Sequence, residues 1–489
     1  MNLTKFYING EFTESSSNET LGIINPATEE EIGIVALGSI EDVDRAVYSA
    51  RKAFSVSSKL SKTDRLDILK TVRENYKKRF NDLSEAIRLE MGAPIKLAEG
   101  AQAATGLGHL KTAIRVLENH EFEYKHGDYI VREEPIGVCG LITPWNWPIN
   151  QIVSKVAPAF AAGCTVILKP SEIAPLSAMI IAEIMHESKI PAGMFNLVNG
   201  LGNIVGEAMS AHKDIDMMSF TGSTRGGVAV ATASAATVKR VSQELGGKSA
   251  NIILDDDSFT KSITNGVTHV MSNTGQSCNA PTRMLVPLSR HDEALDIAKN
   301  SVENIKVGKP DDINTDLGPL VSITQYNKVQ NLIEKGIEEG AQLVSGGKGK
   351  PEGFEKGYYV KPTIFGNVSN NMIIAKEEIF GPVLSIIPYD DIEHAVSIAN
   401  DTVYGLAAYV TGEDQKKCLE VARELRAGQI SLNYGSSGPS APFGGYKQSG
   451  NGREKAEWGL DEFLEIKAIW EVRFFNINNW SIFFLLFNN

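Results

Sequence analysis

Residues 137–169, GVCGLITPWNWPINQIVSKVAPAFAAGCTVILK, decide the fold. This stretch begins with an apolar run (137–142), turns through Pro-Trp-Asn-Trp-Pro, and continues with helical spacing from about Ile149 to Ala162. It ends in a second apolar run at 165–168. Short buried strands that alternate with helices at this spacing are typical of a parallel sheet covered by helices on both faces.

The same alternation continues downstream. We expect a helix at 176–188, a strand at 195–198 (FNLV), a turn and helix at 200–210, and a strand at 217–220 (MMSF). This order predicts an α/β fold with a doubly wound, Rossmann-type parallel sheet. Ligands bind such sheets at the carboxyl ends of the strands, so the turns there are candidate binding segments. These turns are residues 143–148, 169–175 and 221–227.

The flanking regions have different patterns. Upstream, short β-prone runs give way at Ser39 to helical spacing that extends to about Arg115. Ser39 is expected to cap the first helix, and Gly92 is expected to end a later one. A second alternating region follows, with a strand at 251–254 and a helical pattern at 258–272. We therefore expect a domain boundary near residue 245.

Composition limits the class of protein. The 489 residues are enough for roughly two to four domains, with an ordinary globular balance of 42% hydrophobic and 22% charged residues. A net charge of −12, without a dense Lys/Arg run, argues against a general nucleic-acid binder. The four cysteines form no CxxC pair, which argues against a zinc site or a disulfide framework and favours a reducing compartment. We see no signal-peptide pattern and no apolar run of about 18 residues, so we expect a cytoplasmic protein.

Two glycine-rich turns could bind a phosphate. Residues 200–206 (GLGNIVG) have one residue too many for GxGxxG, and a tight strand-to-helix turn explains them better. Residues 220–227 (FTGSTRGG) follow an apolar strand and open a helix, so their backbone N–H groups could approach a pyrophosphate. A plain turn remains the alternative for this second segment.

Three further segments carry candidate chemistry. Lys169 and Glu172 end the strand at 165–168 and could hold ribose hydroxyls, although an exposed ion pair would have the same pattern. Cys278 lies in a polar turn (NTGQSCNAPTR), which suits a nucleophile better than the apolar settings of Cys139 and Cys164. Glu244, before a Gly-Gly pair in QELGGK, could be a general base or a solvated residue at a helix end.

The order of these motifs closely resembles one known family. FTGST, ELGGK, NTGQSCNAPTR, EEIFGPV and PFGGYKQSGNGRE follow one another, with PWNWP and KPSE upstream. Together they resemble the NAD(P)-dependent aldehyde dehydrogenase superfamily, from about residue 6 to about residue 469. The pairing of ELGGK with the GQxC turn is the most specific part of this resemblance.

The resemblance implies a reaction and three catalytic residues. Such enzymes oxidise an aldehyde to an acid through a covalent thiohemiacetal and then a thioester. By this resemblance Cys278 is the nucleophile, and Asn146 with the Cys278 backbone N–H stabilises the oxyanion. Glu244 is the base that activates Cys278, the deacylating water, or both. Lys155 and Glu454 match positions that can form a proton path to Glu244 in some relatives.

The resemblance also implies NAD as the cofactor and no metal. Lys169 and Glu172 would hold the adenosine ribose, and Glu172 should repel a 2′-phosphate, which makes NADP the weaker alternative. Ser223 would contact the pyrophosphate, and Glu378 and Phe380 the nicotinamide ribose. The complete predicted set is Thr143, Pro144, Trp145, Lys169, Glu172, Gly222, Ser223, Leu245, Gly246, Glu378 and Phe380.

The predicted substrate tunnel is roomy and partly polar. By resemblance its lining would include Trp147, Gln151, Ser154, Ser277, Asn279, Ser436 (within residues 435–438) and Phe443. We expect broad specificity for aliphatic or aromatic aldehydes. No Arg in these segments is placed to bind a dicarboxylic semialdehyde, and the aromatic box for a quaternary ammonium group is incomplete, so both charged substrates are disfavoured.

Other activities remain open at this point. Coenzyme-A-acylating relatives typically lack the Glu at position 244, so its presence favours hydrolysis over acyl transfer. An NADP-preferring semialdehyde dehydrogenase is a further enzyme alternative. A thiol hydrolase that uses Cys278 without NAD turnover, or an inactive structural relative, would belong to other classes.

The resemblance implies a division of the chain. Residues 1–118 and 135–245 would form the NAD-binding domain, and 246–443 the catalytic domain. Residues 119–134, a hairpin that turns at 126–128, would join 444–470 in an oligomerisation element of a homodimer or homotetramer. Residues 471–489 are an atypical tail: an extra interface, a weak membrane contact or, as we favour, an extension not adapted to the fold.

Overall fold

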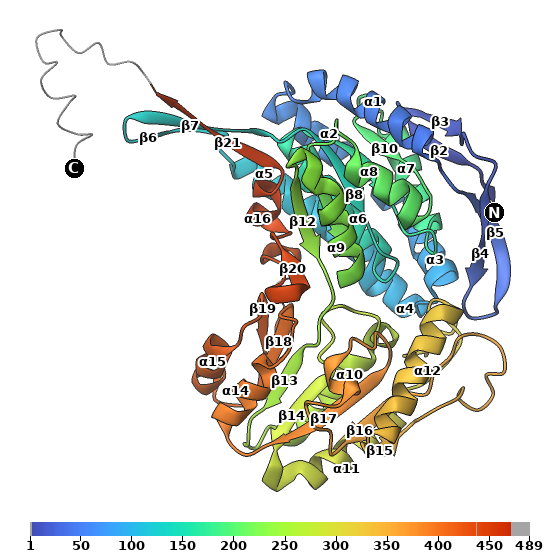
Figure 1. Cartoon of the computed structure of the whole chain (residues 1–489), viewed down its shortest axis with the longest axis vertical. Coiled ribbons are helices and arrows are strands. Elements are labelled where there is room, and N and C mark those ends of the chain that lie inside the picture. Colours follow the sequence, from blue (N-terminus) through green and yellow to red (C-terminus); the bar gives the residue numbers. More distant parts are fainter. Residues whose placement is uncertain (1, 437, 471–489) are drawn as a thin grey trace, which may run out of the picture.

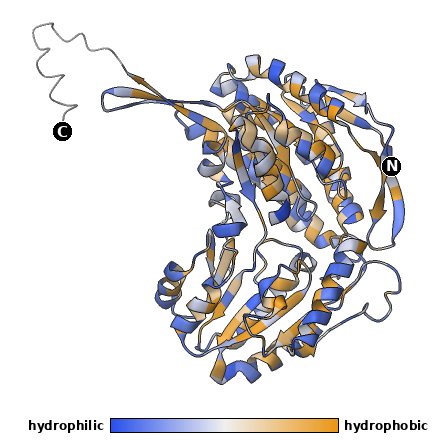
Figure 2. Cartoon of the chain, in the orientation of Figure 1, coloured by the Kyte–Doolittle hydropathy of each residue, from blue (hydrophilic) through white to orange (hydrophobic). Residues whose placement is uncertain are grey.

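Two large sheets organise the chain, one above the other in Figure 1. The computed structural model describes residues 2–436 and 438–470. The predictions for residue 437 and for the tail at 471–489 therefore lie outside the described residues. Figure 2 shows the apolar strands of both sheets between helices whose polar faces point outward. Among the described residues, no helix has both the length and the apolarity that crossing a membrane requires.

The upper sheet contains the strands expected from residues 137–221. Its eight strands have the order β20-β12-β11-β8-β9-β10-β2-β3, and the five central ones run parallel. These five are β8 (Val138–Ile142), β9 (Thr165–Lys169), β10 (Phe195–Leu197), β11 (Met217–Thr221) and β12 (Arg240–Glu244). The antiparallel edge strands are β2 (Lys5–Ile8), β3 (Glu11–Glu14) and β20 (Gly450–Asn451). The predicted doubly wound sheet is thus present.

Helices cover both faces of this sheet. The long ones are α1 (Ile40–Ser57), α2 (Lys62–Lys78), α3 (Phe80–Met91), α5 (Ala104–Asn119), α6 (Pro148–Ala162), α7 (Leu176–Glu187) and α9 (Thr224–Ser234). The short ones are α4 (Ile95–Leu97), the π-helical turns η1 (Ala98–Ala103) and η2 (Gly202–Gly206), α8 (Glu207–Ala211) and η3 (Ala235–Thr237). The tight turn predicted for GLGNIVG is therefore η2.

The predicted helix ends agree with the structure. Ser39 precedes α1 with extended backbone, and its N–H donates to the Asp42 carboxylate at 3.0 Å. Gly92 ends α3 in the left-handed region, at φ +76°, which glycine adopts without strain. The interpretation of Glu244 as a solvated residue at a helix end is wrong. Residues 240–244 form a strand, and Glu244 is buried.

The lower sheet has seven strands in the order β15-β16-β17-β14-β13-β18-β19. They are β13 (Ala250–Ile253), β14 (Arg283–Pro287), β15 (Gln342–Ser345), β16 (Thr363–Gly366), β17 (Val383–Tyr389), β18 (Ala407–Thr411) and β19 (Gln429–Leu432). The accompanying helices are α10 (Phe259–Met271), η4 (Ser272–Gly275), η5 (Leu288–Arg290), α11 (His291–Glu303), α12 (Ile323–Glu338), α13 (Ile373–Lys376), α14 (Ile392–Asn400) and α15 (Gln415–Glu424). The chain changes sheet between β12 and β13, which is where the sequence pattern places the domain boundary.

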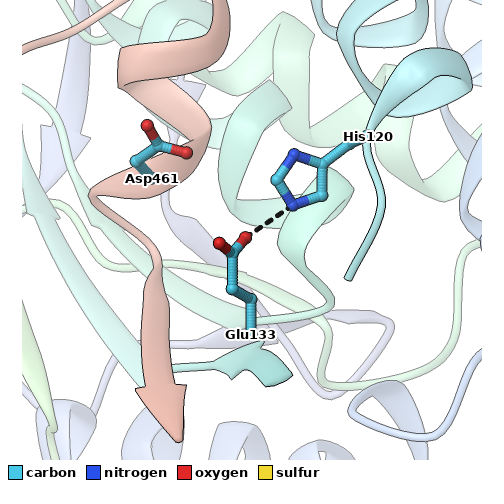
Figure 3. A group of neighbouring side chains, drawn as sticks. All are labelled: His120, Glu133 and Asp461. Carbon is cyan, nitrogen blue, oxygen red and sulfur yellow. Dashed lines mark ion pairs between the residues drawn. The ribbon is translucent and has the colours of Figure 1, made fainter. Parts of the chain in front are cut away.

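A three-stranded antiparallel sheet projects from the upper body in Figure 1. It consists of β6 (Glu123–His126), β7 (Tyr129–Pro135) and β21 (Leu464–Trp470). Its base is joined to the body by an ion pair of 2.7 Å between His120, after α5, and Glu133 on β7. Figure 3 shows Asp461 beside this pair, at the end of α16 (Ala456–Asp461).

The range 444–470 contributes to more than this projecting sheet. Only β21 belongs to it, whereas β20 extends the eight-stranded sheet and α16 packs against α5 and α6. The remaining short elements are η6 (Gly438–Ser440) and η7 (Lys447–Ser449). At the other end of the chain, β1 (Asn2–Leu3), β4 (Thr20–Asn25) and β5 (Glu30–Ala36) form a separate small sheet.

Candidate active site

The carboxyl ends of four parallel strands meet at one edge of the upper sheet. β8 pairs with both β9 and β11, so the strand order reverses at β8. Ile142 pairs with Lys169 on β9 and with Phe220 on β11, and Thr221 pairs with Glu244 on β12. The register therefore aligns the three turns that the sequence singled out with the end of β12. Ligands of doubly wound sheets bind at this type of reversal.

Lys169 and Glu172 form an ion pair at the end of β9. The Lys169 ammonium donates to the Glu172 carboxylate at 3.1 Å and to the Pro170 carbonyl at 2.9 Å. The Lys169 side chain is 3% exposed and that of Glu172 is 29% exposed, so the pair is not the freely exposed one that the alternative interpretation described. Burial lowers the pKa of Lys169, and the Glu172 carboxylate opposes that shift.

The turn after β11 is the start of α9. Ser223 is the N-cap, and its hydroxyl accepts from the Gly226 N–H at 3.2 Å. The Gly222 N–H donates to the Glu244 carbonyl at 3.0 Å, which ties this turn to the end of β12. Buried Leu245 follows, and its N–H donates to the Ser449 carbonyl at 3.0 Å. The start of α9 thus lies at the end of β12, where Glu244 is.

Two hydroxyls at this edge have no protein partner. The Thr143 and Thr221 side chains are buried at the ends of β8 and β11, and neither hydroxyl makes a hydrogen bond to another described residue. Buried polar groups are usually paired, so unpaired ones mark places where a ligand or water completes the structure. The strand ends therefore form a polar site rather than a filled core.

Cys278 lies in a strained turn. Asn273 and Thr274 adopt left-handed backbone at φ +53° and +55°, and Gly275 follows at φ +70°. A side chain at position 275 would overlap the Gly381 carbonyl, so only glycine fits there. Left-handed conformations of non-glycine residues cost free energy and concentrate at functional sites.

Asn146 is attached to this turn. Its side-chain amide nitrogen donates to the Gln276 backbone carbonyl at 3.0 Å, and its backbone carbonyl accepts from the Asn273 side-chain amide at 3.0 Å. Gln102 adds a second layer, because its amide donates to the Asn273 side chain at 3.0 Å and to the Asn146 carbonyl at 3.2 Å. Sequence reasoning missed Gln102, which sits in a helical segment without any motif.

The Gly-Gly pair explains how the Glu244 segment reaches Cys278. A side chain at Gly247 would overlap the Cys278 carbonyl, and one at Gly246 would overlap the Glu378 carboxylate. The Gly247 N–H also donates to Glu378 at 2.9 Å. These close approaches bring Glu244, Cys278 and Glu378 together although they come from β12, the turn after η4 and the loop before β17.

Phe380 packs against the turn at residues 143–148, whereas Glu378 contacts Gly246 and Gly247. The Phe380 ring packs edge-on against Trp145, with centroids 5.4 Å apart. Phe380 adopts φ +59°, and its carbonyl accepts from the Gln325 amide at 2.7 Å. Burial raises the pKa of Glu378. Pro144 and Trp145 are partly exposed at this point, between β8 and α6.

Glu244 is a buried carboxyl group without a protein partner. Neither of its oxygens makes a hydrogen bond to another described residue. Burial raises its pKa well above the ordinary value, the nearby Glu454 carboxylate raises it further, and the Lys155 ammonium opposes both. Lys155 and Glu454 are themselves a buried ion pair, and Ser154 donates to the same Glu454 carboxylate at 3.3 Å. Lys155 and Glu454 are therefore a buried pair rather than a pair at the surface.

The electrostatics around Cys278 keep its thiol protonated at rest. Burial raises the pKa of Cys278 to about 12, and the negative charges of Glu378 and Glu244 contribute to the shift. The Lys455 ammonium and the Cys278 backbone N–H oppose it. The thiol therefore needs a base at the moment of attack, because the thiolate is the nucleophilic form.

A cavity of about 500 Å³ opens onto Cys278. Six of the predicted residues line it: Trp147, Gln151, Cys278, Asn279, Ser436 and Phe443. It is also lined by residues that sequence reasoning missed, including His109, Asn150, His269, Tyr409, Tyr434 and Lys455.

Two predicted tunnel residues do not line this cavity. Ser154 turns toward Glu454 from buried α6, and the Ser277 hydroxyl accepts from the Trp147 indole N–H at 2.9 Å. Both therefore hold other site residues rather than facing substrate space. Another hollow, of about 580 Å³, lies between α10 and α11 and contains no thiol and none of the predicted site residues.

Comparison with known proteins identifies the family that the motifs resemble. The aldehyde dehydrogenase family matches residues 12–469. The chain is 52% identical to 3-succinoylsemialdehyde-pyridine dehydrogenase of a Pseudomonas species, over 95% of this chain and 98% of that protein. It is 49% identical to a putative aldehyde dehydrogenase of Staphylococcus haemolyticus, over 96% and 98%.

Solved structures agree in fold. Aldehyde dehydrogenase C of Pseudomonas syringae, a cysteine-to-alanine variant solved with NAD⁺ and octanal, matches with a TM-score of 0.96 and 50% identity, covering 97% of this chain and 98% of that one. An aldehyde dehydrogenase of Mycobacterium tuberculosis, solved with NAD⁺, matches with a TM-score of 0.94 and 37% identity over 97% and 99%. The predicted fold class and the predicted resemblance are both confirmed, and the chain belongs to the aldehyde dehydrogenase family.

Proposed function

We propose that this chain oxidises an aldehyde to the carboxylic acid with NAD, through a covalent intermediate on Cys278. One observation carries the proposal: Cys278, the Asn146 amide and the unpaired Glu244 carboxyl converge beside one cavity and next to a polar strand-end site. The confirmed family membership and the NAD⁺ complexes of two similar structures support the same activity.

The strand-end site suits NAD. Its unpaired Thr143 and Thr221 hydroxyls, the Lys169–Glu172 pair and the start of α9 are donors and acceptors for ribose and phosphate groups. In our proposal Lys169 and Glu172 hold the adenosine ribose. The other contacts come from Thr143, Pro144, Trp145, Gly222, Ser223, Leu245, Gly246, Glu378 and Phe380. NAD, when bound, accepts the hydride that leaves the substrate carbon.

The chain's own residues carry the covalent steps. The Cys278 sulfur bonds to the carbonyl carbon, its proton passes to a base, and the carbonyl oxygen becomes an oxyanion. The Asn146 amide and the Cys278 N–H stabilise this charge, as fixed donors do in acyl-transfer enzymes. After loss of the hydride, a thioester remains on Cys278. Glu244 then takes a proton from the attacking water, and the S–C bond breaks to release the acid.

Glu244 is suited to this second role. A carboxyl group whose pKa is raised by burial is a stronger base than one in water. Its two unpaired oxygens can accept hydrogen bonds from a water molecule. We therefore favour hydrolysis over transfer of the acyl group to coenzyme A.

The experiment that tests the proposal is a direct assay. NADH formation is followed at 340 nm with purified protein, NAD and a panel of aldehydes, with and without coenzyme A. We expect turnover that does not require coenzyme A. Turnover that depends on coenzyme A would replace the hydrolytic proposal by acyl transfer, and ester hydrolysis without any NADH would indicate a thiol hydrolase.

Replacing Asn146 by alanine should lower kcat by about 10²–10³-fold, because one oxyanion donor is lost. Asn146 also holds the Cys278 turn, so position and charge stabilisation must be separated. The rate of Cys278 alkylation by iodoacetamide serves as the control. If alkylation slows as much as kcat, Asn146 acts by placing the turn and its oxyanion role is contradicted.

NAD should be preferred over NADP, because the Glu172 carboxylate would face a 2′-phosphate. Glu172→Gln removes this charge and frees the Lys169 ammonium, so we expect kcat/KM with NADP to rise by about 10-fold or more. Glu187→Gln, which changes the same charge at the exposed end of α7, is the matched control. Equal or better use of NADP by the unaltered protein would contradict the assignment of Glu172.

We propose that β21 contacts a second copy of this chain. β21 is an edge strand, and Ile466 and Trp470 on it are each 72% exposed. An edge strand with exposed apolar side chains is a site for pairing with another chain. Light scattering should give the mass of a homodimer or homotetramer, and Ile466→Lys should lower that mass. A monomeric unaltered protein would contradict this proposal.

A further inference from the structure

The 3-succinoylsemialdehyde-pyridine dehydrogenase and aldehyde dehydrogenase C have about equal identity to this chain but are associated with different aldehydes. One is named for a pyridine semialdehyde, and the other was solved with octanal. The choice therefore depends on the residues of this chain that line the cavity at Cys278.

Lys455 gives that cavity a positive charge. The lining contains no Asp, Glu or Arg among the described residues. Its two histidines are neutral near pH 7, since burial lowers the pKa of His109 to about 4 and lowers that of His269 as well. Lys455 is thus the one lining residue of the described chain that can supply a positive charge; burial lowers its pKa, and the nearby Glu454 and Glu244 carboxylates oppose that shift.

The Lys455 ammonium makes no ion pair with a described residue. It lies 4.3 Å from the centre of the Phe443 ring, and no carboxylate of the described residues lies within 4.0 Å of it. The adjacent Glu454 is paired with Lys155. The other site lysine, Lys169, is paired with Glu172. Burial of an unpaired ammonium is costly, and an anion at this position would compensate for it.

The backbone at Lys455 is strained in a way that glycine would relieve. Lys455 and Ala456 adopt φ +72° and +49° in succession at the start of α16. Two consecutive left-handed residues with side chains cost free energy that glycine would not. The strained turn directs the Lys455 side chain toward Phe443 and the cavity.

We propose that Lys455 selects aldehydes that carry a carboxylate at the far end of a short chain. The ammonium would bind this carboxylate while the aldehyde carbon meets Cys278. The amides of Asn150, Gln151 and Asn279 line the same cavity and can donate further hydrogen bonds. This inference rests on the proposed function, and it reverses the expectation from sequence, which considered only arginines.

The activity test compares pairs of aldehydes of equal length, one with a terminal carboxylate and one with a terminal methyl group. The unaltered protein should have a kcat/KM for the carboxylate that is higher by about 10-fold or more, the usual scale of a charged hydrogen bond. Lys455→Met and Lys455→Gly should each lower this ratio by a similar factor, while Lys455→Arg should retain it. Lys455→Gly removes the backbone strain as well, so agreement with Lys455→Met assigns the effect to the charge.

Two results would overturn the proposal. One is an unaltered protein that does not prefer the carboxylate. The other is an equal loss with both aldehydes in Lys455→Met, because Lys455 would then act on the Cys278 thiol, whose pKa it lowers.

A binding test separates this proposal from the proposed function. Glutarate should protect Cys278 from iodoacetamide better than its neutral diamide does, and Lys455→Met should remove the difference. This measurement does not depend on NADH formation, so it can be made even if no aldehyde is oxidised. The comparison of glutarate with its diamide uses the unaltered protein, so it can be made even if the variants fail to fold. Equal protection by glutarate and the diamide in the unaltered protein would overturn the role of Lys455.

Discussion

Replacing Cys278 by alanine is expected to abolish NADH formation, with kcat lower by about 10⁴-fold or more. In our proposal the Cys278 sulfur bonds to the substrate, and no other described thiol reaches the cavity, because Cys139, Cys164 and Cys418 are buried in the cores. Without the S–C bond neither the thiohemiacetal nor the thioester can form. The measurement is absorbance at 340 nm at saturating aldehyde and NAD.

The matched control is Cys418→Ala. Cys418 lies in α15 within the core of the lower sheet and takes no part in the site. This variant should keep its kcat and lose only a modest amount of stability, seen as a lower unfolding midpoint. Substantial NADH formation by Cys278→Ala, with Cys418→Ala normal, would mean that the reaction does not proceed through a covalent adduct on Cys278.

Replacing Glu244 by glutamine is expected to lower steady-state kcat by about 10²–10⁴-fold, the usual contribution of a general base. If Glu244 acts on the deacylating water, the thioester still forms and then accumulates. Rapid mixing should therefore record a first burst of NADH that approaches one equivalent per site, followed by slow turnover. Absence of the burst would assign Glu244 to activation of Cys278 instead.

The pH dependence follows from the direction of the pKa shift. Burial raises the pKa of Glu244, so its basic form is lost at a higher pH than for an ordinary glutamate. Deacylation should accelerate as pH rises through this pKa, and Glu244→Gln should lack that limb of the profile.

Glu90→Gln is the matched control for Glu244. Glu90 is also fully buried, with a pKa raised to about 7, but it accepts from the Leu176 and Ser177 N–H groups at the start of α7. The Glu90→Gln change should lower the free energy of unfolding rather than kcat. A similar fall in kcat for Glu90→Gln would show that the loss in Glu244→Gln reflects the removal of any buried carboxyl group.

The local sequence was sufficient for several features. Alternating apolar runs and helical spacing predicted the strands and helices between 137 and 221, because these periods depend on neighbouring residues alone. Ser39 and Gly92 marked helix ends for the same reason. The order of the motifs identified the family, and the resemblance predicted the roles of Cys278, Glu244 and Asn146.

The tertiary structure decided which of these groups are free to act. Lys155 and Glu454 are 299 residues apart, and their buried ion pair cannot be read from either motif. Ser154 and Gln151 lie on the same buried helix, yet only Gln151 lines the cavity, because α6 contacts different neighbours all around its surface. Glu244 became a buried, unpaired carboxyl group because β12 ends inside the molecule.

Lys455 shows most clearly what the sequence predicted and what only the tertiary structure decided. The sequence by itself determined the fold and the family and predicted the reacting residues, since these depend on local patterns and on residue identity. It did not distinguish one lysine from another. Only the packed structure paired Lys155 and Lys169 with carboxylates and left Lys455 unpaired beside the cavity, because electrostatic partners and burial depend on distances that the fold alone creates.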